Sequence, residues 1–286
     1  MDYGQTVAPV ARPVQVRRVE PSRGLIAVDF AELWRYRELL YRILWRDTKA
    51  RYKQTFLGPA WAILRPVISM VLMAAVFGGL AGFKSGTGIP YPLFVFAGML
   101  IWTYFASALS GATSCILNNA GIMSKVYFPR LYAPFSAVAS PLIDLALAMT
   151  VTLGLFAWFG VWPNWHVVFV PVFVLLALVA GLGVGLWFAG AAVRYRDITF
   201  TVPYLTQIGM YATPVLYPVS RLPKPYSSLI ALNPMTSVVE GFRWALIGTP
   251  APDAAVLCTS AGVGVVLLVA ALYYFRRVER TIVDHM

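Results

Sequence analysis

The chain has 286 residues, of which 59% are apolar or aromatic and only 12% are charged, and its formal net charge is +11 at pH 7. Soluble domains are about 45–50% apolar and about 25% charged, so this chain has too few polar side chains to cover itself in water. The composition excludes a single soluble domain and a disordered protein, and it predicts an integral membrane protein.

The N-terminal region divides into two parts. Residues 1–24 carry three prolines and four arginines without an apolar core, and we expect them to form a disordered cytoplasmic tail. In residues 25–53, apolar side chains recur at the spacing of a helical face, with charged side chains on the other side. This pattern predicts an amphipathic interfacial helix along the inner membrane surface, because the segment is too charged to cross. A simple anchor and a contact with a cytoplasmic partner are both consistent with it.

Four basic side chains precede the first apolar segment: Arg46, Lys49, Arg51 and Lys53. The Gly58-Pro59 pair that follows breaks the helix, because proline has no N–H to donate and glycine permits a sharp turn. We interpret this cluster as a candidate seat for an anionic headgroup at the inner mouth of the protein. Charge that only sets the membrane topology is the alternative.

Six apolar segments are long enough to cross the roughly 30 Å of hydrocarbon as helices. Within a transmembrane domain of residues 54–286, they lie at about 61–82, 93–117, 133–160, 167–193, 202–217 and 254–275. None of them alternates apolar and polar residues as the strands of a barrel do, so the predicted fold class is an all-α integral membrane protein.

Asp144 lies inside the third predicted span, where an ionisable group is costly and usually faces the protein interior. A structural partner or a wet seam between helices explains such a residue. A proton-coupled carrier would also use one, but the sequence has no obvious inverted repeat of the kind that many carriers contain.

The fifth span is the shortest and the most polar, and it is the candidate channel lining. Tyr204, Gln207 and Tyr211 fall within a narrow arc at about 100° per residue. Hydroxyls, amides and aromatic faces suit contact with a sugar chain in transit. The opposite side of the span carries Thr206, Thr213 and Tyr217. Hydrogen bonding between helices explains that second face better than a channel does.

Residues 218–253 are too long and too apolar for a plain loop, and prolines punctuate them. Two short pieces, about 226–232 and 235–247, predict a re-entrant helical pair on the external side. Glu240 and Arg243 lie three positions apart on the second piece, a spacing that permits a local ion pair. A static cap on the external surface is the alternative.

The distribution of basic residues predicts the orientation. The predicted connections and termini place 19 Lys and Arg residues on one side of the membrane and 4 on the other. Cytoplasmic loops are the ones enriched in Lys and Arg, so both termini are expected in the cytoplasm. This sidedness accounts for the net charge without nucleic-acid binding, and it favours contact with anionic membrane lipid.

Five short segments resemble those of one membrane-protein family in order and spacing: Arg51–Trp61, Ala62–Pro66, Asn118–Arg130, Tyr195–Ile198 and Asn233–Arg243. They are similar to the ABC-2 type permeases that export bacterial polysaccharides, in particular the O-antigen permeases, with the teichoic-acid exporters close by. The resemblance extends from residue 29 to the end of the chain. Exporters of capsular polysaccharide, teichoic acid or drugs share this architecture and remain alternatives.

The resemblance implies a transporter subunit in the bacterial inner membrane and not an enzyme. Two copies of the chain would form a channel for a lipid-linked polysaccharide, most specifically O-antigen. Two copies of a separate ATPase would bind ATP and magnesium, and this chain itself has no G-x-x-x-x-G-K-[ST] loop to do so. No cofactor or metal is expected in this chain, since His166 has no neighbours at ligand spacing and no paired catalytic groups occur.

The resemblance also implies roles for particular residues. The four basic residues before the first span would hold a pyrophosphate-lipid headgroup. The residues expected to contact the ATPase are Trp34, Arg42, Lys125, Phe128, Pro129 and Arg130. The residues expected in an external gate are Asn233, Pro234, Glu240 and Arg243.

Overall fold

The computed structural model describes residues 34, 37–53, 57–123 and 130–285, and the regular structure in these ranges is entirely helical. The tail predicted at residues 1–24 lies outside the described residues. The helix predicted over 25–53 is described from Arg37 onward, where it runs without interruption to Tyr52. Its position relative to a membrane stays a prediction.

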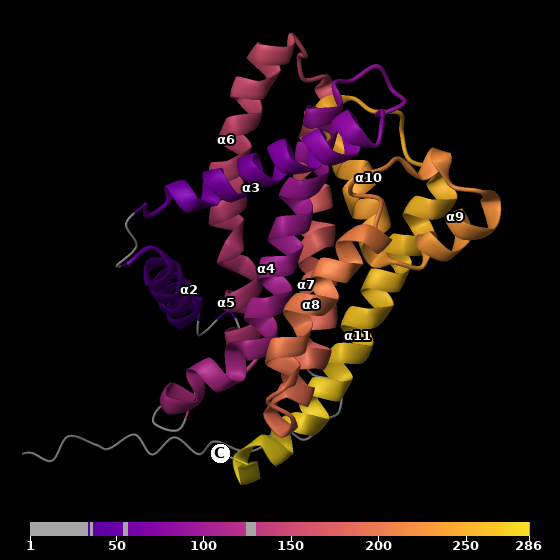
Figure 1. The fold of residues 1–286 in the computed structure, drawn as a ribbon. Helices are drawn as coiled ribbons and strands as arrows, with labels where there is room; N and C mark the ends of the chain where they lie inside the picture. The colour runs from indigo at the N-terminus through magenta and orange to yellow at the C-terminus, as the bar shows by residue number, and fades with distance from the viewer. Residues whose placement is uncertain (1–33, 35–36, 54–56, 124–129, 286) are drawn as a thin grey trace, which may run out of the picture.

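The elements follow one another along the chain as a series of helices (Figure 1). They are α2 (Arg37–Tyr52), α3 (Ala60–Met73), the π-helical η1 (Ala74–Leu80), α4 (Tyr91–Met123), α5 (Tyr132–Ala139), α6 (Pro141–Phe159), η2 (Trp165–Phe169), α7 (Val170–Arg194), α8 (Ile198–Ala212), η3 (Val219–Arg221), α9 (Lys224–Ala231), α10 (Pro234–Ile247) and α11 (Ala254–His285).

Five helical stretches within the described ranges are long and apolar enough to cross a membrane. They are Ala60–Leu80, Tyr91–Gly121, Tyr132–Phe159, Trp165–Arg194 and Ala254–Val278. These stretches coincide with five of the six predicted spans. The α2 helix ends before the Gly58-Pro59 pair, where Gly58 has a φ of +49°, so the predicted break is confirmed.

The helix predicted at 202–217 differs from the structure at its C-terminal end. The corresponding helix, α8, has 15 residues and ends at Ala212, so it spans only about 22 Å. Thr213 is extended, with φ −100° and ψ 146°. Thr213 precedes Pro214, and the proline ring disfavours helical geometry in the residue before it. The predicted continuation of this helix to Tyr217 is therefore wrong.

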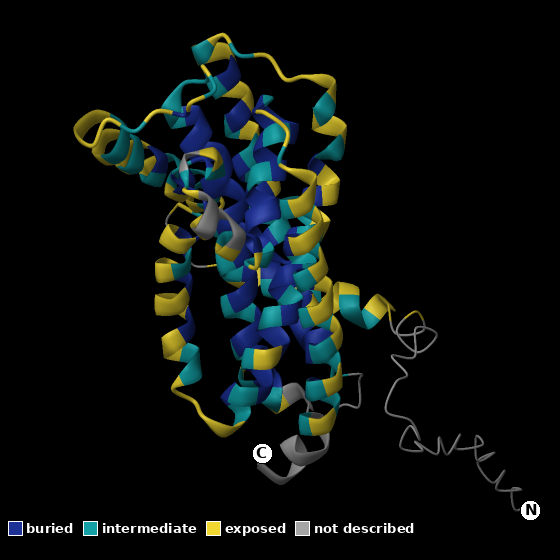
Figure 2. Cartoon of the chain, turned by 90° about the vertical axis from the view of Figure 1, so that its right-hand side faces the viewer, coloured by how far each residue is buried: buried dark blue, intermediate teal, exposed yellow. Residues whose placement is uncertain are grey.

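The centre of the bundle is α4, which contacts α3, α5, α6, α7, α8 and α10. Figure 2 shows buried residues concentrated along this axis and exposed residues on the surrounding helices. Small residues allow α7 to approach its neighbours closely: a Cβ added at Gly185 would lie 2.5 Å from the Cβ of Ala112 in α4. On another side of α7, a Cβ at Gly183 would lie 3.0 Å from the backbone nitrogen of Leu268 in α11.

The region between α8 and α11 contains the two predicted helical pieces, α9 and α10. The α10 helix is buried along most of its length and contacts α4, α7 and α11, whereas α9 lies at the periphery (Figure 1). Asn233 begins α10, because its side chain accepts a hydrogen bond from the Met235 N–H at 2.9 Å. Pro234 follows at the first helical position, where its missing N–H costs nothing.

Candidate functional site

A cavity of about 490 Å³ lies where the end of α2 meets α3, α4 and α6. Ligand pockets typically measure about 300–1,000 Å³, so this space is large enough for a headgroup-sized molecule. Its lining combines charged, hydroxyl-bearing and aromatic side chains: Arg51, Tyr52, Trp61, Arg65, Thr103, Tyr104, Ser107 and Asp144. Apolar and proline residues of α3, α4 and α6 complete the wall.

Asp144 has two partners at the edge of this cavity. Arg51 donates a hydrogen bond to its carboxylate, with Nη1 2.7 Å from Oδ2, and the Tyr52 hydroxyl donates to Oδ1. Burial, followed by the hydrogen bond to Asp144, raises the pKa of Tyr52 to about 12, so this phenol stays protonated and remains a donor at neutral pH. The structural partner predicted for Asp144 is therefore present.

Arg65 is the second guanidinium of the cavity. Its Cζ lies over the ring of Trp61, 6.0 Å from the ring centroid. Among the residues that the structure describes, the ion pairs within 4.0 Å are Arg46–Asp47 and Arg51–Asp144. Arg65 therefore faces the cavity without a carboxylate partner in the described part of the chain. Two cations and one carboxylate give the lining a net positive charge, which favours an anion.

The four bases predicted at the inner mouth do not converge on one point. Arg51 lines the cavity, whereas Arg46 is directed to Asp47 and to Asn119, whose Oδ1 lies 2.6 Å from Nη2. Lys49 and Lys53 are exposed. The sequence interpretation missed Arg65, although a lone cation one turn inside an apolar span is a recognisable signal.

The two faces of α8 have different environments. Tyr204 is 70% exposed, Tyr211 is 46% exposed and Gln207 is also exposed, so the predicted channel-lining face is not covered by this chain. On the opposite side, Thr206 is buried, and Thr213 accepts a hydrogen bond from Asn233 Nδ2 at 2.8 Å. This bond joins the residue that follows α8 to the start of α10, whereas Thr206 and Tyr217 of the same face donate to the nearby carbonyls of Pro203 and Tyr211.

Arg243 of α10 is 1% exposed and binds three backbone carbonyls (Figure 1 shows α10 beside α4). Its Nε donates to Phe94 O at 3.1 Å, its Nη1 donates to Pro214 O at 2.6 Å, and its Nη2 donates to Val215 O. The Cζ atom also lies 3.8 Å from the centroid of the Phe94 ring. We call this arrangement the arginine clamp.

The local ion pair predicted between Glu240 and Arg243 is wrong within the described structure, where the two charged groups do not lie within 4.0 Å. Glu240 instead accepts a hydrogen bond from the Val219 N–H at 3.0 Å. The reason is that α8 ends early, so the carbonyl groups at its end have no partners within the helix. Arg243 donates hydrogen bonds to the next two carbonyls, those of Pro214 and Val215. Both charged residues thus hold the segment between α8 and α9.

The residues expected to contact an ATPase are only partly described. Trp34, which lies before α2, is 71% exposed, and Arg42 of α2 is also exposed. Arg130 lies just before α5. Lys125, Phe128 and Pro129 lie outside the described residues. In the described ranges, no three His, Cys, Asp or Glu side chains are grouped as metal ligands would be.

Comparison with known proteins identifies relatives across most of the chain. The sequence model of the ABC-2 type transporter family matches residues 38–247. The chain is 36% identical over 247 residues to the O-antigen export system permease protein RfbA of Myxococcus xanthus, which covers 85% of this chain and 94% of the relative. It is 26% identical over 208 residues to the protein of the same name from Klebsiella pneumoniae, with 72% and 79% covered. It is 24% identical over 208 residues to the polysialic acid transport protein KpsM of Escherichia coli, with 71% and 78% covered.

Proposed function

Because the chain belongs to the ABC-2 type transporter family, we propose that it is the membrane subunit of an ATP-driven exporter that moves a lipid-linked polysaccharide out of the cytoplasm. O-antigen is the substrate that we favour. The observation that supports this choice most strongly is the 36% identity to an O-antigen export permease over nearly the whole length of that relative. The subunit carries out translocation, and the covalent chemistry belongs to its partner.

The proposed assembly contains two copies of this chain and two copies of a cytoplasmic ATPase, which binds ATP and magnesium. It lies in the bacterial inner membrane, with both termini in the cytoplasm. The 19-to-4 distribution of basic residues supports that orientation. The exposed apolar side chains of α3, which include Ile68, Val71 and Leu72, are available to membrane lipid and to the second copy.

Other substrates of the same kind of exporter are the alternative. The likeness to a polysialic acid transport protein supports a capsular polysaccharide as the second candidate, and teichoic acid or drugs are weaker candidates. A proton-coupled carrier that uses Asp144 is less well supported, because Arg51 and Tyr52 already bind that carboxylate.

We assign three regions to the path of the substrate. The cavity with Arg51 and Arg65 is the proposed site for the pyrophosphate of the lipid carrier. The exposed face of α8, with Tyr204, Gln207 and Tyr211, is the proposed contact with the sugar chain. The segment held by Asn233, Pro234, Glu240 and Arg243 is the proposed external gate.

Deletion of this gene together with the gene of its ATPase partner in the native host tests the function. We expect the surface polysaccharide to disappear while lipid-linked polymer accumulates inside the cell. Both effects should reverse when the permease is supplied together with an active ATPase, and neither should reverse with an ATPase that lacks its phosphate-binding lysine. Normal surface polysaccharide in the deletion strain would disprove the proposal. A secondary carrier would instead transport without any ATPase.

The cavity makes a separate prediction for Arg65→Gln. A hydrogen bond to a charged group contributes about 1.5–3 kcal/mol, and each 1.4 kcal/mol is a factor of ten in affinity, so we expect export to fall about tenfold or more. The measurement is polymer export by cells that contain equal amounts of membrane-inserted permease. Lys84→Gln removes an exposed cation that does not line the cavity and is the matched control, with export expected to stay within twofold of the wild type. Equal export by both variants would exclude the cavity as the headgroup site.

A further inference from the structure

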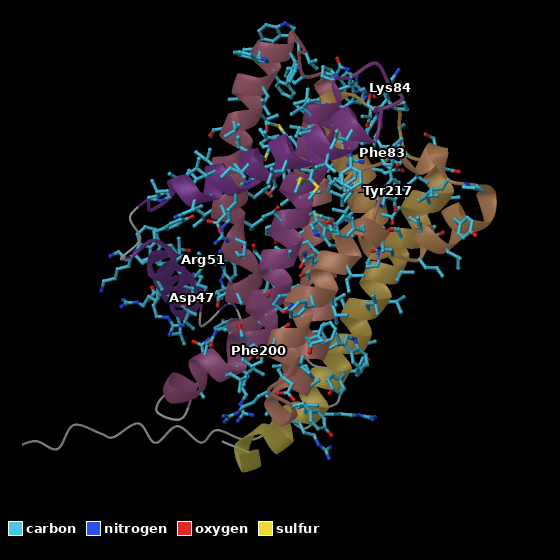
Figure 3. The ribbon with its side chains drawn as sticks, in the orientation of Figure 1. Asp47, Arg51, Phe83, Lys84, Phe200 and Tyr217 are labelled. Atoms are coloured by element: carbon cyan, nitrogen blue, oxygen red, sulfur yellow. The ribbon has the colours of Figure 1, made fainter. Side chains whose placement is uncertain are left out.

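Polar contacts join α2 to the α5–α6 segment at three successive levels. Ser136 donates a hydrogen bond to Asp47, with Oγ 3.2 Å from Oδ2, and the hydroxyl oxygens of Thr48 and Ser140 lie 3.5 Å apart. At the third level, Asp144 accepts hydrogen bonds from Arg51 and Tyr52. We call this set of seven residues the polar seam. Figure 3 shows Asp47 and Arg51 on the side of α2 that faces α6.

The spacing of the polar seam places its contacts in register. Ser136, Ser140 and Asp144 are each four positions apart, so they lie on one face of the α5–α6 segment. Their partners on α2 are Asp47, Thr48, Arg51 and Tyr52, which span about a turn and a half. The apolar contact between Ile43 and Tyr132, both buried, extends the same junction toward the start of α5. The two helical segments are thus joined along a line and not at a single point.

The polar seam crosses the junction between α5 and α6. Ser140 at this junction has helical dihedrals, with φ −58° and ψ −38°, so the two helices form one stretch in which Pro141 only lacks an N–H for the hydrogen-bond ladder. Proline positions are where helices bend most readily. Ser136 lies before Pro141, Ser140 lies directly beside it and Asp144 lies after it, so α2 is bound on both sides of the proline.

We propose that α2, α5 and α6 move as one rigid unit during transport, with the polar seam fixing the angle at Pro141. In this arrangement, Arg51 and Asp144 are positioning residues that pass a displacement of the exposed α2 surface to the third membrane span. The opposite arrangement is a hinge at Pro141, in which α2 slides along α5 and α6. The proposal rests on the proposed function only in naming an ATPase as the source of the displacement.

A cysteine pair across the polar seam tests the rigid unit. Thr48→Cys and Ser140→Cys place two sulfurs where hydroxyls lie 3.5 Å apart, close enough for a disulfide after a small rotation. The native Cys115 and Cys258 are free and are replaced by Ala and Ser. After oxidation of the assembled permease–ATPase complex in vesicles, the extent of cross-linking is read from protection against a maleimide reagent. The two single-cysteine variants are the controls.

A rigid unit predicts that the fully cross-linked complex exports polymer and hydrolyses ATP within twofold of its reduced form. Arrest on oxidation that a reductant reverses would overturn the proposal, because it would mean that α2 must move relative to Ser140. If the wild-type complex hydrolysed ATP but exported no polymer, the proposed function would be disproved. Equal ATP hydrolysis by the oxidised and reduced forms of the cysteine pair would still support the rigid unit in that case.

Charge variants test the positioning role through the coupling ratio, the number of ATP molecules hydrolysed per polymer exported. Asp144→Asn is expected to raise this ratio at least threefold in complexes that assemble normally, and so is Arg51→Gln, which also removes a cation from the proposed headgroup site. The double exchange Arg51→Asp with Asp144→Arg restores the ion pair and is expected to bring the ratio back toward the wild type. An unchanged ratio in both single variants would overturn the role assigned to this pair.

Discussion

Replacement of Arg243 by Met should abolish export and lower the amount of folded permease at least tenfold. The substitution keeps much of the apolar volume but removes the guanidinium that donates to the carbonyls of Phe94, Pro214 and Val215. Each buried group left without a hydrogen bond costs about 1–3 kcal/mol, and the total stability of a protein is only about 5–15 kcal/mol. The measurements are the fraction of monodisperse protein in mild detergent and its melting temperature.

Arg277→Met is the matched control for the arginine clamp, because Arg277 is exposed near the end of α11. We expect this variant to give wild-type yield and export. The clamp also requires the absence of a side chain at Gly98: a Cβ there would overlap Arg243 and lie 2.9 Å from the carbonyl oxygen of Val215. A well-folded Arg243→Met variant with an unchanged melting temperature would show that the clamp does not stabilise the protein.

Gly185→Leu is expected to have the second-largest effect, a loss of most of the folded protein. Even the first carbon of the new side chain would lie 2.5 Å from the Cβ of Ala112, so α4 and α7 must separate or tilt. Overpacking of a well-packed interior costs about 1–3 kcal/mol, and close helix approach is a main source of association between membrane helices. The measurement is the melting temperature in detergent together with the yield of inserted protein.

Gly262→Leu is the comparison for this experiment, since a Cβ at Gly262 of α11 would meet nothing within 4 Å. Leucine favours a helix over glycine, so this variant should be neutral or slightly more stable. If both leucine variants behaved alike, the close approach of α4 and α7 would not be a determinant of stability.

Much of the fold could be predicted from the sequence because long apolar runs are a direct consequence of bilayer thickness. The five long spans and the two pieces that became α9 and α10 follow from such runs and from the prolines between them. The end of α8 could also have been predicted, because Pro214 restricts the backbone geometry of Thr213. The apolar segment continues to Tyr217, and its length predicted a longer helix than the proline permits.

The contacts of the candidate site were less predictable, because they join residues that are far apart in the chain. Arg51 and Asp144 are separated by 93 positions, and Arg243 and Phe94 by 149. Sequence spacing alone paired Arg243 with Glu240, its neighbour on the helix, and grouped Arg51 with the three nearby bases. In the structure, both arginines instead bind groups on distant helices. A hydrogen bond from a guanidinium that is shielded from water contributes more to stability than an ion pair on the surface.

The arginine clamp also has a consequence for the order in which the nascent chain matures. Phe94 leaves the ribosome 149 residues before Arg243, which at about 5–20 residues per second is a delay of roughly 7–30 s. The carbonyls of Pro214 and Val215 are made only 29 and 28 residues before Arg243, so they wait about 1.4–6 s for the same donor. The connection from α10 to α4 therefore forms only after α10 has been synthesised. In a chain terminated before residue 243, the carbonyls of Pro214 and Val215 have no guanidinium to donate to them.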